Sequence, residues 1–96
     1  MNIKVTKRDG GLSVVLDGRL DTTTAPELER ILADHYGSIE SLSINCERLV
    51  YISSAGLRVL LGAHKKTGGS MKLTGVCELV MEVLQMTGFS DILTIE

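Results

Sequence analysis

The sequence predicts a mixed α/β fold: a sheet of four to five strands with helices packed on it. Apolar and polar residues alternate on both sides of Asp9-Gly10, which indicates an antiparallel N-terminal hairpin. Downstream, short apolar segments alternate with segments of helical periodicity. Because a strand, a helix and a further strand form a crossover unit, the later strands are expected to lie parallel. Ninety-six residues suit one domain, spanning residues 1–96.

The first helix is expected to begin at about Ala25. Thr24 and Glu27 have capping-box spacing, and Pro26 falls in the first turn, where its missing N–H costs little. Gly37 is placed to end this helix. The residues with the spacing of its apolar face are Leu28, Ile31 and Leu32.

The second strand–helix unit surrounds two serines. Residues 42–46 read as a short strand, and a helix is expected to begin at Ser53-Ser54 and to end at residues 65–69, where two lysines precede two glycines. One face of this helix is predicted from the i, i+3, i+4, i+7 spacing of Leu57, Leu60, Leu61 and His64.

The C-terminal part of the chain predicts a third unit. Met71 and Leu73 flank Lys72 in a short strand, a helix follows, and Gly88 would close it. Residues 92–95 could add an edge strand. The apolar stripe of the third helix consists of Leu79, Val80, Val83 and Leu84.

The two adjacent serines are candidate functional residues. Serine is a favoured N-cap, so capping alone explains one of them. Two neighbouring hydroxyls exceed what one cap needs, and a helix N-terminus offers free N–H donors and partial positive charge, a setting that tolerates an added phosphate. One capping hydroxyl and one modifiable hydroxyl is the sharper interpretation of Ser53-Ser54.

Composition narrows the class of partner and the location. The net charge is −2, the basic residues are not grouped into one run, and only three residues are aromatic, which disfavours nucleic-acid binding. No long apolar segment predicts a signal peptide or a membrane anchor, so a cytoplasmic location is expected. Cys46 and Cys77 lack metal-ligand spacing and are expected to be buried free thiols. We expect neither a metal nor a cofactor.

An enzyme is not expected. The Gly-x-Ser-x-Gly pattern of hydrolases is absent around Ser54, and the only histidines, His35 and His64, are predicted near helix C-termini. Without a base in reach a serine is a weak nucleophile. No phosphate-binding loop sequence occurs either.

The segment Tyr-Ile-Ser-Ser-Ala-Gly-Leu-Arg-Val-Leu-Leu at residues 51–61, with Gly-Arg-Leu-Asp at residues 18–21, resembles the STAS domain of bacterial anti-sigma factor antagonists. The resemblance covers nearly the whole chain and implies that Ser54 is phosphorylated by a partner anti-sigma factor serine kinase. The sequence departs from the family pattern at Ser53, where an Asp is usual, and at Asn45, where an acidic residue often ends the strand. Ser53 is therefore the alternative phosphoacceptor.

The resemblance also implies a docking face and further partners. The docking face implied by the resemblance consists of Asp21, Ser53, Ser54, Ala55, Gly56 and Arg58, with Ala55 and Arg58 on an exposed first helical turn. A serine phosphatase would reverse the modification, and neither nucleic acid nor membrane would be bound. Asp21 has an equally good structural explanation, because it could bond to backbone in the Thr-rich turn. The alternative function is a STAS module that binds a nucleotide, lipid or other small ligand, or a fixed subunit of a complex.

Overall fold

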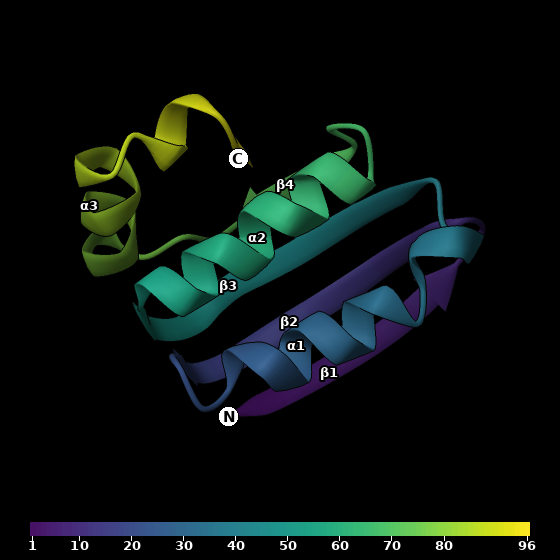
Figure 1. The fold of residues 1–96 in the computed structure, drawn as a ribbon, viewed down its shortest axis with the longest axis horizontal. Helices are drawn as coiled ribbons and strands as arrows, with labels where there is room; N and C mark the ends of the chain where they lie inside the picture. The colour runs from purple at the N-terminus through teal and green to yellow at the C-terminus, as the bar shows by residue number, and fades with distance from the viewer.

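The computed structural model describes residues 1–96 as a five-stranded sheet with the strand order β1-β2-β3-β4-β5 (Figure 1). Two short 3₁₀ segments, Tyr36–Ser38 and Phe89–Asp91, supplement the main elements. The main elements are β1 (Asn2–Arg8), β2 (Gly11–Leu20), α1 (Ala25–Ala33), β3 (Ser41–Ile52), α2 (Ser54–Lys66), β4 (Met71–Thr74), α3 (Glu78–Met86) and β5 (Thr94–Ile95).

The sheet combines one antiparallel pair with three parallel pairs, as predicted. β1 and β2 pair antiparallel, and β2 through β5 pair parallel with their neighbours. The hairpin turns at Asp9 and Gly10, whose φ angles of 48° and 83° are those of a tight turn matched to strand twist. The fold class predicted from the sequence is therefore confirmed.

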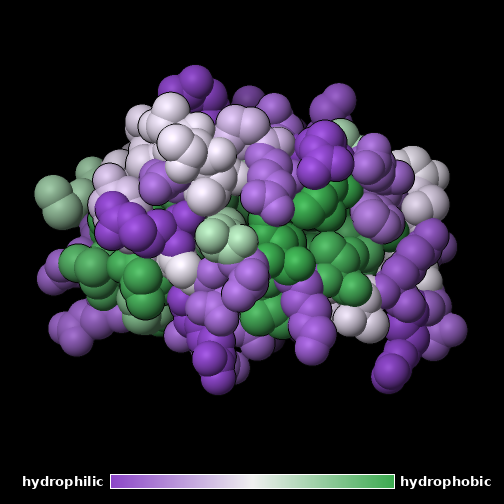
Figure 2. Space-filling view, turned by 90° about the horizontal axis from the view of Figure 1, so that it is seen from below, coloured by the Kyte–Doolittle hydropathy of each residue, from purple (hydrophilic) through white to green (hydrophobic).

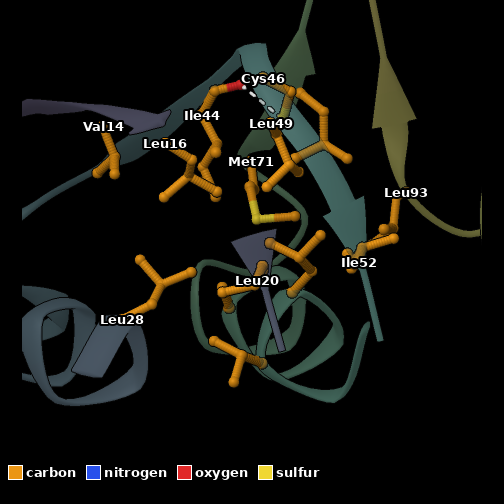
Figure 3. Packing of buried hydrophobic residues seen from close by; sticks show 14 of the residues in the cluster. Val14, Leu16, Leu20, Leu28, Ile44, Cys46, Leu49, Ile52, Met71 and Leu93 are labelled. Carbon is orange, nitrogen blue, oxygen red and sulfur yellow. Dashed lines mark hydrogen bonds between the residues drawn. The ribbon is translucent and has the colours of Figure 1, made fainter. Parts of the chain in front are cut away.

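Helices α1 and α2 lie side by side over one face of the sheet, and α3 lies at the end of the sheet where β3 finishes (Figure 1). The core between the helices and the sheet consists of 21 buried residues, most of them Leu, Ile and Val. Figure 3 shows Leu28 of α1 pointing toward Leu16 and Leu20 of β2, with Met71 of β4 close by. Figure 2 shows the molecule from the side of β1 and α1, where hydrophobic residues are visible at the surface and hydrophilic residues surround them.

β3 is longer than predicted. The predicted strand ended at Cys46, whereas the structure extends it to Ile52. The register with β2 shifts twice, between Val15 and Asp17 and between Gly18 and Arg19, so β3 carries two bulges. Each bulge breaks the alternation of apolar and polar residues, so the alternating pattern in the sequence ends at the first bulge, after Cys46.

The ends of α1 also differ from the prediction. The helix begins at Ala25 as expected but ends at Ala33, and Gly37 lies in the 3₁₀ segment after it. Thr24 occupies the N-cap position without a side-chain capping bond, because its hydroxyl donates to the Arg19 carbonyl (2.7 Å). The capping box between Thr24 and Glu27 is therefore not formed.

Helix α2 buries a slightly different face from the predicted one. Leu57 and Leu60 are buried, but Leu61 and His64 are only half-buried. The other buried residues of α2 are Gly56, Val59 and Ala63. The helix contacts α1 as well as the sheet, and Val59 lines a groove between the two helices. The buried face is therefore rotated toward α1.

The C-terminal elements lie where the sequence places them. α3 ends before Gly88, which has a φ of 80°, and β5 forms the expected edge strand. Within the predicted stripe, Val80 and Leu84 are buried, whereas Leu79 is exposed. None of the helices combines the length and the apolar character that crossing a membrane requires.

The two cysteines are free thiols. Cys46 is buried, and its burial raises the pKa of the thiol to about 12. Cys77, predicted to be buried as well, is only partly so, and its Sγ donates to the Leu49 carbonyl at 3.4 Å. This contact links the start of α3 to the end of β3.

Candidate functional site

Two strand-to-helix junctions lie at the same end of the sheet, because β2 and β3 run parallel and each is followed by a helix at its C-terminal end. Leu20 and Ile52, near the ends of these strands, are paired in register. The backbone N–H of Ser53 donates to the Leu20 carbonyl at 2.9 Å. The turn that carries Asp21 and the start of α2 therefore lie next to each other.

The second junction leaves both serine hydroxyls without a protein partner. Ser53 has an extended backbone (φ −101°, ψ 177°) and holds the N-cap position, where its carbonyl accepts from Leu57 N–H at 2.9 Å. Its side chain makes no capping bond, and its Oγ is buried without a hydrogen-bond partner. Ser54 is the first residue of α2 and is exposed. Of the two hydroxyls, that of Ser54 is the accessible one.

The first junction, in contrast, is closed by hydrogen bonds. The Asp21 carboxylate accepts from the Thr23 N–H (3.0 Å), the Thr23 hydroxyl (2.8 Å) and the Thr24 N–H (3.2 Å). The Thr24 hydroxyl accepts from the Asp21 N–H at 2.8 Å. These bonds, that of the Thr23 hydroxyl above all, hold the pKa of Asp21 below its ordinary value. The predicted hydrogen bonds between Asp21 and the backbone of the Thr-rich turn are therefore formed, and they give Asp21 a structural role.

A basic and aromatic pair lies beside Asp21. The Arg19 guanidinium stands over the Tyr51 ring at 4.1 Å from its centroid, and its Nε lies 3.9 Å from Asp21 Oδ2. Arg19 and Tyr51 face each other because they are paired in the β2–β3 register. The prediction from sequence gave neither residue a role. Their pairing follows from the β2–β3 register, and this register depends on the bulges in β3, which the sequence pattern does not reveal.

The first turns of α2 divide the remaining candidates into interior and surface positions. Arg58 is exposed, as expected, and forms no ion pair. Ala55 is half-buried and packs against the core, although it was expected to be exposed. Gly56 is buried: a Cβ there would lie 2.8 Å from Leu20 Cγ and 2.9 Å from Ile52 Cγ1. The structure thus gives Gly56 a packing role between helix and strands, not a surface position.

Neither histidine belongs to this site. His35 Nδ1 lies 2.9 Å from the Ile31 carbonyl at the end of α1. His64 is ten residues beyond Ser54 on the same helix, which corresponds to about 15 Å along the axis. The arrangement therefore presents an exposed hydroxyl at a helix start, with no base from either histidine beside it.

The structure is thus a small α/β domain with a mixed sheet and an exposed serine at the start of its second helix. The family model of the STAS domain matches residues 2–96, and the chain belongs to this family.

Known relatives agree with the family assignment. An anti-sigma-B factor antagonist of Bacillus subtilis (strain 168) is 31% identical over 98 residues, covering 99% of this chain and 90% of the relative. The fold matches a crystal structure of an anti-sigma factor antagonist from Mycobacterium paratuberculosis with a TM-score of 0.87, at 23% identity over 98% of this chain and 83% of that chain.

The fold also matches Bacillus SpoIIAA in its phosphorylated form, with a TM-score of 0.77 at 18% identity, covering 99% of this chain and 91% of that chain.

Proposed function

We propose that this protein is an anti-sigma factor antagonist that binds an anti-sigma factor serine kinase and is switched off by phosphorylation of Ser54. The observation that carries the proposal is the exposed Ser54 hydroxyl at the first position of α2, beside the turn of Asp21. Relatives named as anti-sigma factor antagonists support it, as does a phosphorylated state of a protein with the same fold.

The helix start can accommodate a phosphate without unfolding. A phosphoserine adds roughly −1.5 to −2 charge, and free N–H groups and the positive end of the dipole at a helix start stabilise such a charge. Ser54 is already exposed, so the modification requires no buried group to move. The phosphate would therefore act on the partner and not on the fold.

The chemistry of phosphoryl transfer would belong to the partner. The kinase would supply ATP, metal ion and catalytic base, and a serine phosphatase would remove the phosphate. Ser54 would be a substrate residue, and the chain itself would turn over neither esters nor ATP. On the docking face, Asp21, Arg58 and Ser54 would contact the kinase, and the partly buried Ser53, whose Oγ is shielded from solvent, is the alternative acceptor.

The test uses the purified chain with candidate anti-sigma factor kinases and ATP. We expect one phosphate, located at Ser54 by mass spectrometry, and none on Ser54→Ala, which should still bind the kinase. Ser54→Asp should bind the kinase about 100-fold more weakly while keeping the wild-type circular dichroism spectrum.

Two outcomes would contradict parts of the proposal. Label on Ser53 with Ser54 unmodified would overturn the residue assignment. Equal kinase affinities of Ser54→Asp and the wild type would overturn the electrostatic switch. Ser90→Ala, a substitution in a 3₁₀ segment, is the control and should change neither labelling nor binding.

A second candidate function is a STAS module that binds a small ligand or acts as a fixed subunit without phosphorylation. A basin of about 670 Å³ favours the ligand-binding form, and it is lined by the N-terminal ends of β3 and β4 and by Arg8, Ser13 and Lys72. It contains no aromatic residue to stack on a base. Absence of labelling by any kinase, with ligand-dependent shifts of the NMR signals of these residues, would favour this second function.

A further inference from the structure

The second bulge of β3 places an apolar side chain in solvent. Gly18 pairs with Leu49 and Arg19 pairs with Tyr51, so Val50 is the extra residue and has no partner in β2. Leu49 before it and Ile52 two residues after it are buried, whereas Val50 is 54% exposed. Bulges of this kind redirect a side chain and are frequent beside functional sites.

Tyr51 extends the same exposed surface. It is 36% exposed, and the guanidinium of Arg19, whose side chain is 60% exposed, stacks on its ring. Only five large apolar residues are exposed in the whole chain, and two of them are these neighbours, three and four residues before Ser54. The other three lie on α3 or after it, so Val50 and Tyr51 form the exposed apolar pair at the end of β3.

Two exposed arginines lie at this end of the molecule, one on β2 and one on α2. Arg19 and Arg58 are both exposed, and Arg58 forms no ion pair. The Asp21 carboxylate, 3.9 Å from Arg19 Nε, is already engaged by hydrogen bonds from two threonines. Tyrosine and arginine are residue types enriched at interface hot spots, and the projecting Val50 adds exposed apolar area beside them.

We propose that Val50 and Tyr51 are the apolar anchor by which this protein binds its partner, and that the partner offers an apolar pocket bordered by carboxylates that receive Arg19 and Arg58. This inference rests on the proposed function, because it describes the partner surface that meets Ser54. The anchor is continuous with the phosphorylation site, since residues 50–54 run from the bulge directly into α2.

The charge of such a partner explains how phosphorylation would release it. Before modification, two arginines face the carboxylates of the partner across the rim of the pocket. A phosphate on Ser54 adds roughly −1.5 to −2 charge at the same place, which offsets both arginines and faces carboxylates. Like charges juxtaposed at an interface oppose binding. The phosphate and the carboxylates of the partner would therefore repel each other even though this chain has Ser53, and no negative charge, at the position of the usual Asp.

The experiment compares two substitutions of exposed β-branched residues by isothermal titration calorimetry against the anti-sigma factor kinase. Val50→Thr alters the anchor, and Ile92→Thr alters a residue of similar exposure (49%) outside it. We expect Val50→Thr to raise Kd by about tenfold and Ile92→Thr by less than about twofold. Arg19→Gln should also weaken binding and should reduce the dependence of Kd on salt concentration.

The outcomes separate the anchor from the proposed function. If the wild type binds and Val50→Thr binds equally well, the anchor is wrong and the proposed function stands. If Arg19→Gln leaves the salt dependence unchanged, the carboxylate rim is wrong. If the wild type binds no anti-sigma factor kinase, the proposed function and the anchor fall together. Melting temperatures of both threonine variants should match the wild type, because each replaced side chain is about half exposed.

Discussion

The two strand-to-helix junctions differ in how they are held. The junction from β2 to α1 is held by side-chain hydrogen bonds, since Asp21 and Thr24 satisfy each other and the surrounding backbone. The junction from β3 to α2 has no side-chain hydrogen bond and is held by packing around Gly56 and by one backbone bond to Leu20. The second junction therefore leaves donors and hydroxyls free at the start of α2, while the first cannot change without breaking bonds.

The largest effect is expected where packing holds the second junction. Gly56→Ala should lower the free energy of unfolding by about 1–3 kcal/mol, because the new Cβ would lie within 3 Å of Leu20 and Ile52. Urea unfolding measures this difference. Gly62→Ala in the same helix is the control, since nothing lies within 4 Å of its Cβ position. It should stabilise by up to about 1 kcal/mol. Stabilisation by both substitutions would show that Gly56 does not hold the junction.

The first junction should respond to loss of a hydroxyl. Thr24→Val should lower the free energy of unfolding by about 1–2 kcal/mol, because it leaves the Arg19 carbonyl and the Asp21 N–H without the partner they now share. Thr22→Val, at an exposed residue whose hydroxyl makes no such bonds, should stay within about 0.5 kcal/mol of the wild type. The same urea measurement on both variants decides whether hydrogen bonds hold this junction.

Acid should weaken the first junction selectively. The pKa of Asp21 is lowered in the folded state, so its contribution to stability is present above its unfolded pKa, about 3.9, and is lost as pH falls through the lower folded pKa. An NMR titration of the Asp21 carboxyl carbon should show a midpoint below that value. Thr23→Val, which removes the main cause of the shift, should move the midpoint upward. A wild-type midpoint at the ordinary value would contradict the observed bonding.

Much of the fold could be predicted from sequence because its signals are local. Asp9-Gly10 specifies the hairpin, and residues 65–69 specify the end of α2 through charge and glycine. The parallel order of the later strands follows from the alternation of strands and helices. The start of α2 at Ser53-Ser54 was also visible, because a helical pattern begins directly after it.

The features that were missed depend on partners distant in sequence. The Thr24–Glu27 spacing predicted a capping box, yet the Thr24 hydroxyl bonds to Arg19 on the preceding strand. Helical spacing at residues 57–64 did not reveal that α2 turns Val59 toward α1. The bulges of β3 insert residues without a periodic signal, so the pairing of Arg19 with Tyr51 beside the site could not be read from the chain alone.

The smallest effect is expected at Ser53, and it is the sharpest test of the contrast. A serine that caps a helix with its hydroxyl typically contributes about 1 kcal/mol, but the Ser53 hydroxyl makes no capping bond and is buried without a partner. Removing a buried, unsatisfied hydroxyl relieves a desolvation cost. Ser53→Ala should therefore stay within about 0.5 kcal/mol of the wild type in urea unfolding or exceed it.

The same variant also tests which hydroxyl is available for modification. Because the Ser54 hydroxyl is exposed and that of Ser53 is buried, Ser53→Ala should be phosphorylated at Ser54 at the wild-type rate. A loss of about 1–2 kcal/mol in Ser53→Ala would mean that Ser53 does cap α2 in solution. The two junctions would then both be held by side-chain hydrogen bonds, and the freedom of the second could no longer support the proposal that Ser54 accepts a phosphate.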